Sequence, residues 1–172
     1  MDLRRLIRSS TLLYAAAAPL LYVTATMIAI QLAAHPTGLH PWYETPWNDG
    51  LLAQLDREIA SARGFTLGIA FTLAFEAALL AALGDRLNRR STIGGLVLCA
   101  ATGMVYLMSL ASAGLATYAI VLYPSGDADL GLLFPGWYFP ALVVIGATTV
   151  AALVTWLTVA VRDASAAQRS TL

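Results

Sequence analysis

The sequence of 172 residues combines 59% apolar residues with only 12% charged residues, and its mean hydropathy is +0.72. Because soluble domains hold about 45–50% apolar and about 25% charged residues, this composition predicts an integral membrane protein. The net charge is zero, so nothing indicates a nucleic-acid surface. A single cysteine, Cys99, excludes an intrachain disulfide, a dithiol redox pair and a zinc site built on several cysteines.

Four apolar segments are long enough to cross a bilayer, whose hydrocarbon core of about 30 Å needs roughly 20 helical residues. They are residues 11–34, 64–84, 93–122 and 137–161. Continuous apolar runs without strand-like alternation exclude a transmembrane barrel, so the spans are predicted to be helices. We therefore predict an all-α fold, with residues 1–172 forming one transmembrane domain built as a four-helix bundle.

The arginines predict the orientation of these spans. Of ten arginines, eight lie before residue 11, within residues 85–92 or after residue 161, and only Arg57 and Arg63 lie elsewhere. The positive-inside rule then predicts that both termini are cytoplasmic, with a cytoplasmic loop at 85–92 and outer loops at 35–63 and 123–136. The absence of lysine is typical of a GC-rich bacterial genome, so we expect a multi-pass protein of the bacterial inner membrane.

Aromatic residues gather at the predicted outer ends of the spans. Tryptophan and tyrosine are enriched at membrane–water interfaces, where the ring is apolar and its polar group reaches water. We therefore predict interfacial anchors at Trp42, Trp47, Trp137 and Tyr138.

The long outer loop divides into two halves. Its first half is rich in proline and is predicted to be irregular. Its second half places Leu51, Leu52, Leu55 and Ile59 on one helical face, and Asp49 is suited to cap the first turn. This pattern predicts a short amphipathic helix over residues 51–62 on the outer surface. The loop has two interpretations: a contact surface for a partner, or a lid over the helix ends.

A metal site is a further hypothesis for this loop. His35, His40, Glu44 and Asp49 fall close together in the sequence, and Asp127 or Asp129 from the other outer loop could complete a set of nitrogen and oxygen ligands for zinc or copper. The spacing matches no established motif, however, and both histidines precede a proline, which favours turn and interface roles.

No cofactor is predicted. A haem held between two membrane helices needs a histidine in each, and the second, third and fourth predicted spans contain none. No arrangement of residues typical of a catalytic site was found either, so an enzyme is not the expected class.

Glu76 is the one ionisable residue well inside a predicted span, about 3 Å from its centre. An acid at this depth is costly and suggests a functional site. Gly68, Thr72 and Glu76 recur every four residues, which predicts a small, polar stripe facing the bundle. A matching stripe on the third span contains Thr102, Tyr106, Ser109 and Ala113.

We expect three residues to surround Glu76, namely Thr72, Tyr106 and Tyr22. No basic residue shares its depth, so Glu76 is expected to hold a proton and to hydrogen bond to hydroxyls such as that of Tyr106. Two interpretations remain: Glu76 exchanges protons or binds a cationic substrate, or it is a hydrogen-bonding residue that fixes helix packing.

Three functional classes follow, and the first is favoured. It is a small accessory or scaffolding subunit of a larger membrane complex, whose partners are the lipid bilayer and either other membrane subunits or further copies of the chain. Small residues at helix-contact spacing, such as Gly64 with Gly68 and Ala147 with Ala151, support such contacts. The alternatives are a proton-coupled transporter component that uses Glu76, and a membrane enzyme or metal site in the outer loop.

Overall fold

The computed structural model describes residues 3–41, 44, 46–89, 93–123 and 130–169. These residues form the helices α1 (Leu3–Ala33), α2 (Asp49–Arg89), α3 (Ile93–Ala116), α4 (Leu130–Leu133) and α5 (Tyr138–Arg169), and a π-helix, η1 (Thr117–Leu122), that continues α3. Apart from an isolated bridge between Leu39 and Pro46, the described residues contain no extended pairing. The predicted all-helical fold is confirmed.

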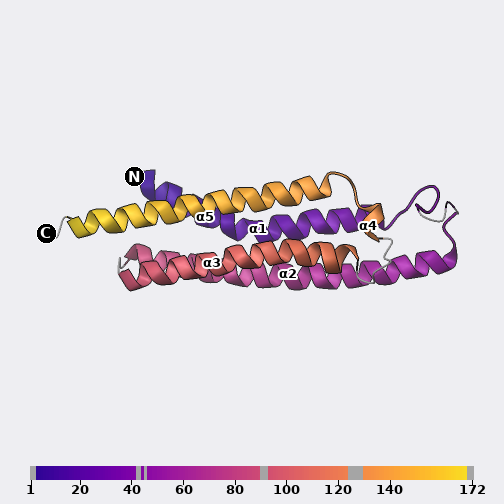
Figure 1. The fold of residues 1–172 in the computed structure, drawn as a ribbon, viewed down its shortest axis with the longest axis horizontal. Coiled ribbons are helices and arrows are strands. Elements are labelled where there is room, and N and C mark those ends of the chain that lie inside the picture. Colours follow the sequence, from indigo (N-terminus) through magenta and orange to yellow (C-terminus); the bar gives the residue numbers. More distant parts are fainter. Residues whose placement is uncertain (1–2, 42–43, 45, 90–92, 124–129, 170–172) are drawn as a thin grey trace.

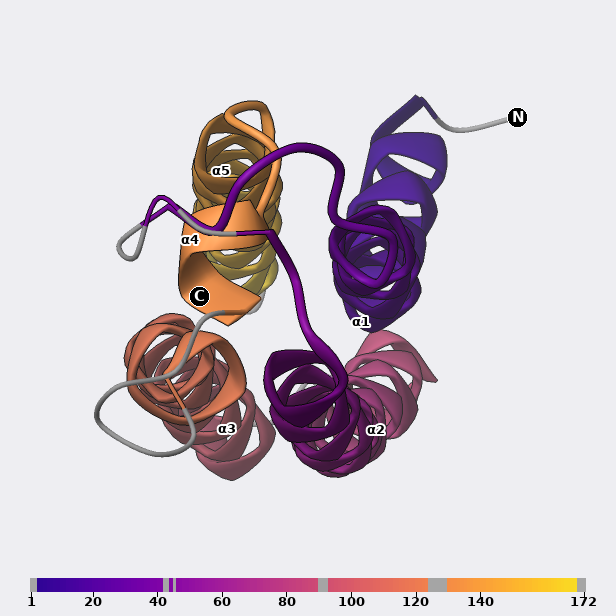
Figure 2. The ribbon, with the colours of Figure 1, turned by 90° about the vertical axis from the view of Figure 1, so that its right-hand side faces the viewer.

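The long helices α1, α2, α3 and α5 run along a common axis (Figure 1). Viewed along that axis, they occupy the corners of a square (Figure 2). Contacts join α1 to α2, α2 to α3, α3 to α5 and α5 to α1, so each helix packs against two neighbours. The first residues of α1 and the last residues of α5 lie at the same end of the molecule (Figure 1).

Three helices in the described part of the chain are long and apolar enough to cross a membrane, namely those over Asp49–Gly84, Val97–Leu122 and Tyr138–Val159. Only 22%, 28% and 17% of their most apolar windows are buried. The apolar part of α1 whose surroundings are described, Ala17–Ala33, is shorter. The chain therefore has the helices of a membrane-embedded protein.

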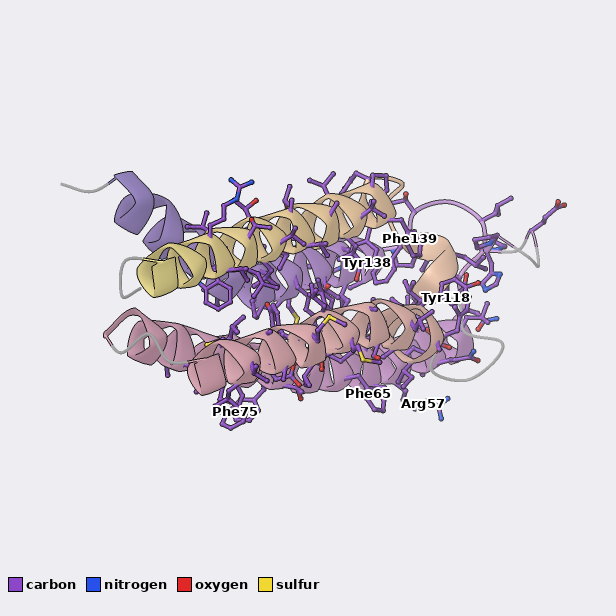
Figure 3. The ribbon with its side chains drawn as sticks, turned by 60° about the vertical axis from the view of Figure 1, so that its left-hand side comes forward. Arg57, Phe65, Phe75, Tyr118, Tyr138 and Phe139 are labelled. Atoms are coloured by element: carbon purple, nitrogen blue, oxygen red, sulfur yellow. The ribbon has the colours of Figure 1, made fainter. Side chains whose placement is uncertain are left out.

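Large apolar side chains cover the outside of these helices. Phe71 is 76% exposed and Leu115 is 74% exposed. Phe65 and Phe75 project away from the helices (Figure 3). The surface thus places its bulkiest apolar groups outward, which is favourable where lipid rather than water surrounds the helices.

The short amphipathic helix predicted over residues 51–62 is helical but is not a separate element. It is the first part of α2, a single helix of 41 residues. Leu55, Ile59 and Ala62 are buried on one face, and Thr66 and Ala70 continue that face into the apolar part of the helix. Because no proline or loop interrupts the sequence between the two parts, the backbone hydrogen bonds continue through the junction.

The start of α2 is capped by Asn48 rather than by the predicted Asp49. The Leu51 backbone N–H donates to Asn48 Oδ1 over 2.9 Å. This satisfies one of the amide groups that lack a partner at a helix N-terminus. Asp49 is instead the first residue of the helix.

The first turns of α2 extend beyond the ends of the other long helices (Figure 1). Their inner face packs in a cluster with the end of α1, η1 and α4, through residues that include Leu55, Ile59, Val121 and Leu130. Glu58, which is 5% exposed, ties α4 to α2. Its carboxylate accepts the Leu130 backbone N–H at 3.0 Å and the Gln54 side-chain N–H at 3.1 Å. We call this packed end, formed by residues 49–62 and 130–134, the α4 cap.

Candidate functional site

Glu76 lies on α2 where that helix faces α3. Ser109 Oγ on α3 donates a hydrogen bond to Glu76 Oε1 over 2.8 Å. The second oxygen, Oε2, is buried and has no hydrogen-bond partner among the described residues. The carboxyl group therefore receives one neutral donor and keeps one buried oxygen without a partner, which is an unfavourable state for an ionised acid.

Of the three residues expected around Glu76, Tyr106 packs in the nearby core. It is fully buried and belongs to the same core cluster as Leu73 and Ala77 of α2. The Thr72 hydroxyl instead donates to the Gly68 carbonyl of its own helix at 3.1 Å. Tyr22 bonds to Thr117 rather than to Glu76. Ser109, the residue that does bond to Glu76, belongs to the predicted stripe on the third span, and its spacing of three from Tyr106 was the signal for it.

A groove runs along the α2–α3 pair and encloses a volume of about 430 Å³. Its lining is made mainly of small and apolar residues. They are Gly64, Phe65, Gly68, Ile69, Thr72, Leu73, Ser109, Ser112, Ala113 and Ala116. Ser109 is shared, because it lines the groove and also donates to Glu76.

The prediction that the stripe with Gly68 and Thr72 faces the bundle is wrong. Both residues are exposed, and they line the groove on the outside of α2. The inner face of α2 is occupied by Thr66, Leu73 and Ala77, all of which are buried. Because residues 68 and 72 point more than a quarter turn away from that face, they cannot lie in the core.

Two glycines of the groove have no close packing contact with any described residue of the chain. A Cβ atom added at Gly64 or Gly68 would meet nothing within 4 Å. Glycine inside a helix costs about 1 kcal/mol relative to alanine, and close helix approach is the usual reason for it in membranes. No helix of the chain itself makes that close approach here.

Five buried hydroxyl groups form a second polar group of residues, the hydroxyl cluster, toward the end of the molecule that carries α4. They are Tyr22 and Thr26 on α1, Thr66 on α2, Thr117 on η1 and Tyr138 on α5. The Tyr22 hydroxyl lies 2.8 Å from Thr117 Oγ1, and the Tyr138 hydroxyl lies 3.0 Å from Thr26 Oγ1. The cluster thus joins the long helices across the interior.

The direction of these hydrogen bonds follows from the threonines. Thr117 Oγ1 donates to the Ala113 carbonyl at 2.7 Å, and Thr26 Oγ1 donates to the Tyr22 carbonyl at 2.8 Å. Each threonine proton is therefore used, so Tyr22 donates to Thr117 and Tyr138 donates to Thr26. Sequence reasoning placed Tyr138 at the interface and missed the cluster, although Tyr22 and Thr26, four residues apart in an apolar span, were its signal.

The predicted metal ligands are not gathered in the described part of the chain. Residues there include no group of three or more His, Cys, Asp or Glu side chains that could hold a metal ion. His35 is exposed, whereas His40 is buried and packs on the Trp47 ring with centroids 4.7 Å apart. Asp127 and Asp129 lie outside the described residues, so a site that includes them stays a prediction.

The predicted interfacial anchors have different environments. Trp137 is 42% exposed beside the start of α5, and its role as an anchor stays a prediction. Trp47 is half-buried against His40. Tyr138 is fully buried and belongs to the hydroxyl cluster, so it is a core residue rather than an anchor. Figure 3 shows its ring near Phe139, at the first turn of α5. Trp42 lies outside the described residues.

The comparisons with known proteins add no relative. No protein family matches the chain, and no curated protein or solved structure is significantly similar to it.

Proposed function

We propose that the protein is a four-span membrane protein, with both termini in the cytoplasm, that acts as an accessory or scaffolding subunit of a larger membrane complex. In this proposal α1, α2, α3 and α5 form a membrane-embedded four-helix bundle. The observation that supports the proposal most directly is the α2–α3 groove, which is lined by small residues and which no other part of the described chain fills. The groove would receive a transmembrane helix from another polypeptide.

The chemistry of the groove favours a helix over a lipid chain as its occupant. A flexible acyl chain packs as well against leucine as against glycine, so it gives no reason for Gly64 and Gly68. The groove also carries a polar group, the Ser112 hydroxyl. This hydroxyl makes no hydrogen bond to any described residue. An unsatisfied hydroxyl is costly in hydrocarbon, and a neighbouring helix can supply its partner.

Photocrosslinking from the groove in cells tests this proposal. A photoreactive residue at position 112 is expected to give a covalent adduct with another polypeptide, and the matched variant with the photoreactive residue at position 115 is expected to give much less. Leu115 is the control because it is on the same helix and 74% exposed but does not line the groove. Adducts with lipid alone at position 112 would refute the proposal.

A second candidate function, proton-coupled transport, is favoured by one observation on Glu76. Its Oε2 is buried without a partner in the described structure, so a proton or a cationic group would find an acceptor there. A transporter of this kind would lose substrate flux in Glu76→Gln at unchanged expression, while Glu58→Gln in the α4 cap would keep it. Full flux in Glu76→Gln would exclude this candidate.

A further inference from the structure

Arg63 lies where the charged part of α2 meets the apolar part. Charged residues occur at several positions of α2 before it, whereas residues 64–75 carry no charge. The side chain of Arg63 is exposed, as is that of Gln31 near the end of α1. An Nη2–H of Arg63 donates to Gln31 Oε1 over 3.1 Å. These two residues, the Arg63–Gln31 pair, therefore join α1 to α2 at the edge of the apolar surface.

The Arg63–Gln31 pair presents hydrogen-bond donors to its surroundings. Arginine only donates, so the amide oxygen of Gln31 faces Arg63 and the amide N–H groups remain as further donors beside the guanidinium. Neither residue makes another hydrogen bond or an ion pair with any residue that the structure describes. The pair is thus a positively charged set of donors, which suits the several acceptor oxygens of a phosphate.

No acidic side chain lies close to Arg63 along the two helices that carry the pair. α1 contains no acidic residue. The nearest acids before Arg63 on α2 are Glu58 and Asp56, five and seven residues earlier. Glu58 is buried in the α4 cap, where it accepts the Leu130 N–H, and Asp56 is about two helical turns away. The charge of Arg63 therefore remains available to a ligand from outside the chain.

An apolar surface begins beside the pair, on the side away from the α4 cap. Ile28 is three residues before Gln31, and Leu67 is four residues after Arg63, so each shares a helical face with its polar neighbour. Because α1 and α2 run in opposite directions (Figure 1), the bond between the pair places Ile28 and Leu67 at about the same level. They are 49% and 56% exposed. The surface therefore matches an amphipathic ligand with an anionic head and a hydrocarbon chain.

We propose that the Arg63–Gln31 pair binds the phosphate of an anionic glycerophospholipid, whose acyl chain packs over Ile28 and Leu67. Arg63 supplies the charge, and Gln31 holds the guanidinium in place and adds an amide donor. Lipid phosphates lie at the boundary between hydrocarbon and water, which corresponds to the position of Arg63 between the charged and apolar parts of α2. A headgroup without its own cation is favoured, because its phosphate charge is left for Arg63.

This lipid site is separate from the proposed docking site for a partner helix. Neither Arg63 nor Gln31 lines the α2–α3 groove. The lipid site therefore does not depend on whether a helix occupies the groove.

Lipid binding to the purified full-length chain tests the proposal. The chain in detergent is titrated with phosphatidylglycerol or with phosphatidylcholine of the same acyl chains, and bound lipids are counted by native mass spectrometry. Arg63→Gln keeps an N–H donor for Gln31 but removes the charge. It is expected to weaken binding of the first phosphatidylglycerol about fivefold and to leave phosphatidylcholine binding unchanged.

Arg57→Gln is the matched control, since it removes the same charge from an exposed arginine of α2. The Arg57 guanidinium donates to the Ala53 carbonyl of its own helix and points away from the bundle (Figure 3). This variant is expected to bind phosphatidylglycerol like the wild type. An equal loss in both variants, or no loss in Arg63→Gln, would overturn the proposal.

A variant at Gln31 separates lipid binding from helix packing. Gln31→Glu keeps an acceptor for Arg63 and so keeps the contact between α1 and α2, but its carboxylate neutralises the guanidinium and repels a phosphate. We expect it to lose as much phosphatidylglycerol binding as Arg63→Gln does. If Arg63 served only to join the helices, Gln31→Glu would bind phosphatidylglycerol like the wild type, and that result would overturn the proposal.

Two further measurements identify the occupant. Glycerol 3-phosphate lacks the chain that packs on Ile28 and Leu67, so it is expected not to displace phosphatidylglycerol; displacement at equal concentration would indicate a site for soluble phosphates and overturn the proposal. The chain extracted directly from its membrane is expected to retain a phospholipid mass that Arg63→Gln lacks. A retained polypeptide in place of that lipid, lost in Arg63→Gln, would also overturn it.

Discussion

Tyr22 and Thr117 are 95 residues apart in the sequence, yet their hydroxyl oxygens lie 2.8 Å apart in the interior. Tyr22 is on α1, and Thr117 is the first residue of the π-helix that continues α3. The hydrogen bond therefore links diagonally opposite helices of the square. It also lies at the junction where α3 ends and the π-helix η1 begins. Turns of π-helix are rare.

Removing the acceptor of this bond is expected to destabilise the protein more than removing the donor. Thr117→Val leaves the buried Tyr22 hydroxyl without its acceptor, whereas after Tyr22→Phe the Thr117 hydroxyl keeps its bond to Ala113. We expect losses of about 1–2 kcal/mol for Thr117→Val and about 0.5–1 kcal/mol for Tyr22→Phe. Unfolding in mixed detergent micelles measures both, and a double-mutant cycle should give a coupling energy above zero.

Tyr118→Phe provides the control for these variants, because Tyr118 is 57% exposed and is outside the hydroxyl cluster. It is expected to change stability by less than about 0.5 kcal/mol. Strictly additive effects of Tyr22→Phe and Thr117→Val would contradict a direct interaction between the two side chains.

Glu58→Ala is expected to loosen the α4 cap without unfolding the long helices. The Leu130 N–H loses its carboxylate acceptor, and the carboxylate holds α4 against α2. Hydrogen exchange at residues 130–133 should then become at least about tenfold faster, a change equivalent to about 1.4 kcal/mol of local stability. Asp56→Ala, an exposed substitution two residues away, should leave this exchange unchanged.

Ser109→Ala is expected to shift the infrared band of the Glu76 carboxyl group, because Ser109 Oγ donates a hydrogen bond to Glu76 Oε1 over 2.8 Å. The band is identified as the one that disappears in Glu76→Gln. An unchanged band in Ser109→Ala would contradict this hydrogen bond.

The proposed orientation predicts opposite accessibility for two exposed arginine positions. Cysteine at position 57, at the start of α2, is expected to react with a membrane-impermeant maleimide added outside intact cells. Cysteine at position 162, in the last part of α5, should react only after the membrane is permeabilised. Both variants are made in a Cys99→Ala background, which removes the single native cysteine. The reverse pattern of labelling would overturn the proposed topology.

Much of the fold was predictable from the sequence because it depends on local properties. The third predicted span, residues 93–122, coincides with α3 together with η1, and the fourth begins within one residue of α5. Long apolar runs form helices wherever the backbone must satisfy its own hydrogen bonds. The separate amphipathic helix was mispredicted because a change from polar to apolar composition does not by itself end a helix.

The candidate site was less predictable, because it depends on which helix faces are paired. The spacing of Gly68, Thr72 and Glu76 identified a stripe but not its direction, and the structure places Gly68 and Thr72 on the outside. Tyr138 was assigned to the interface by its position at a span end, whereas its hydroxyl bonds to Thr26 in the core. Periodicity gives relative positions on one helix, and only contacts with other helices give the absolute rotation.

The amino-acid sequence alone determined that the chain is helical, apolar and suited to a membrane, and that Glu76 is an isolated acid within an apolar segment. These properties follow from composition and from hydrogen bonding within each helix. Only the tertiary structure decided that Ser109 is the partner of Glu76, that five hydroxyl groups meet in the interior, and that an unfilled groove lies between α2 and α3. Those features arise from the rotation and depth of each helix against its neighbours, which side-chain packing between distant segments fixes.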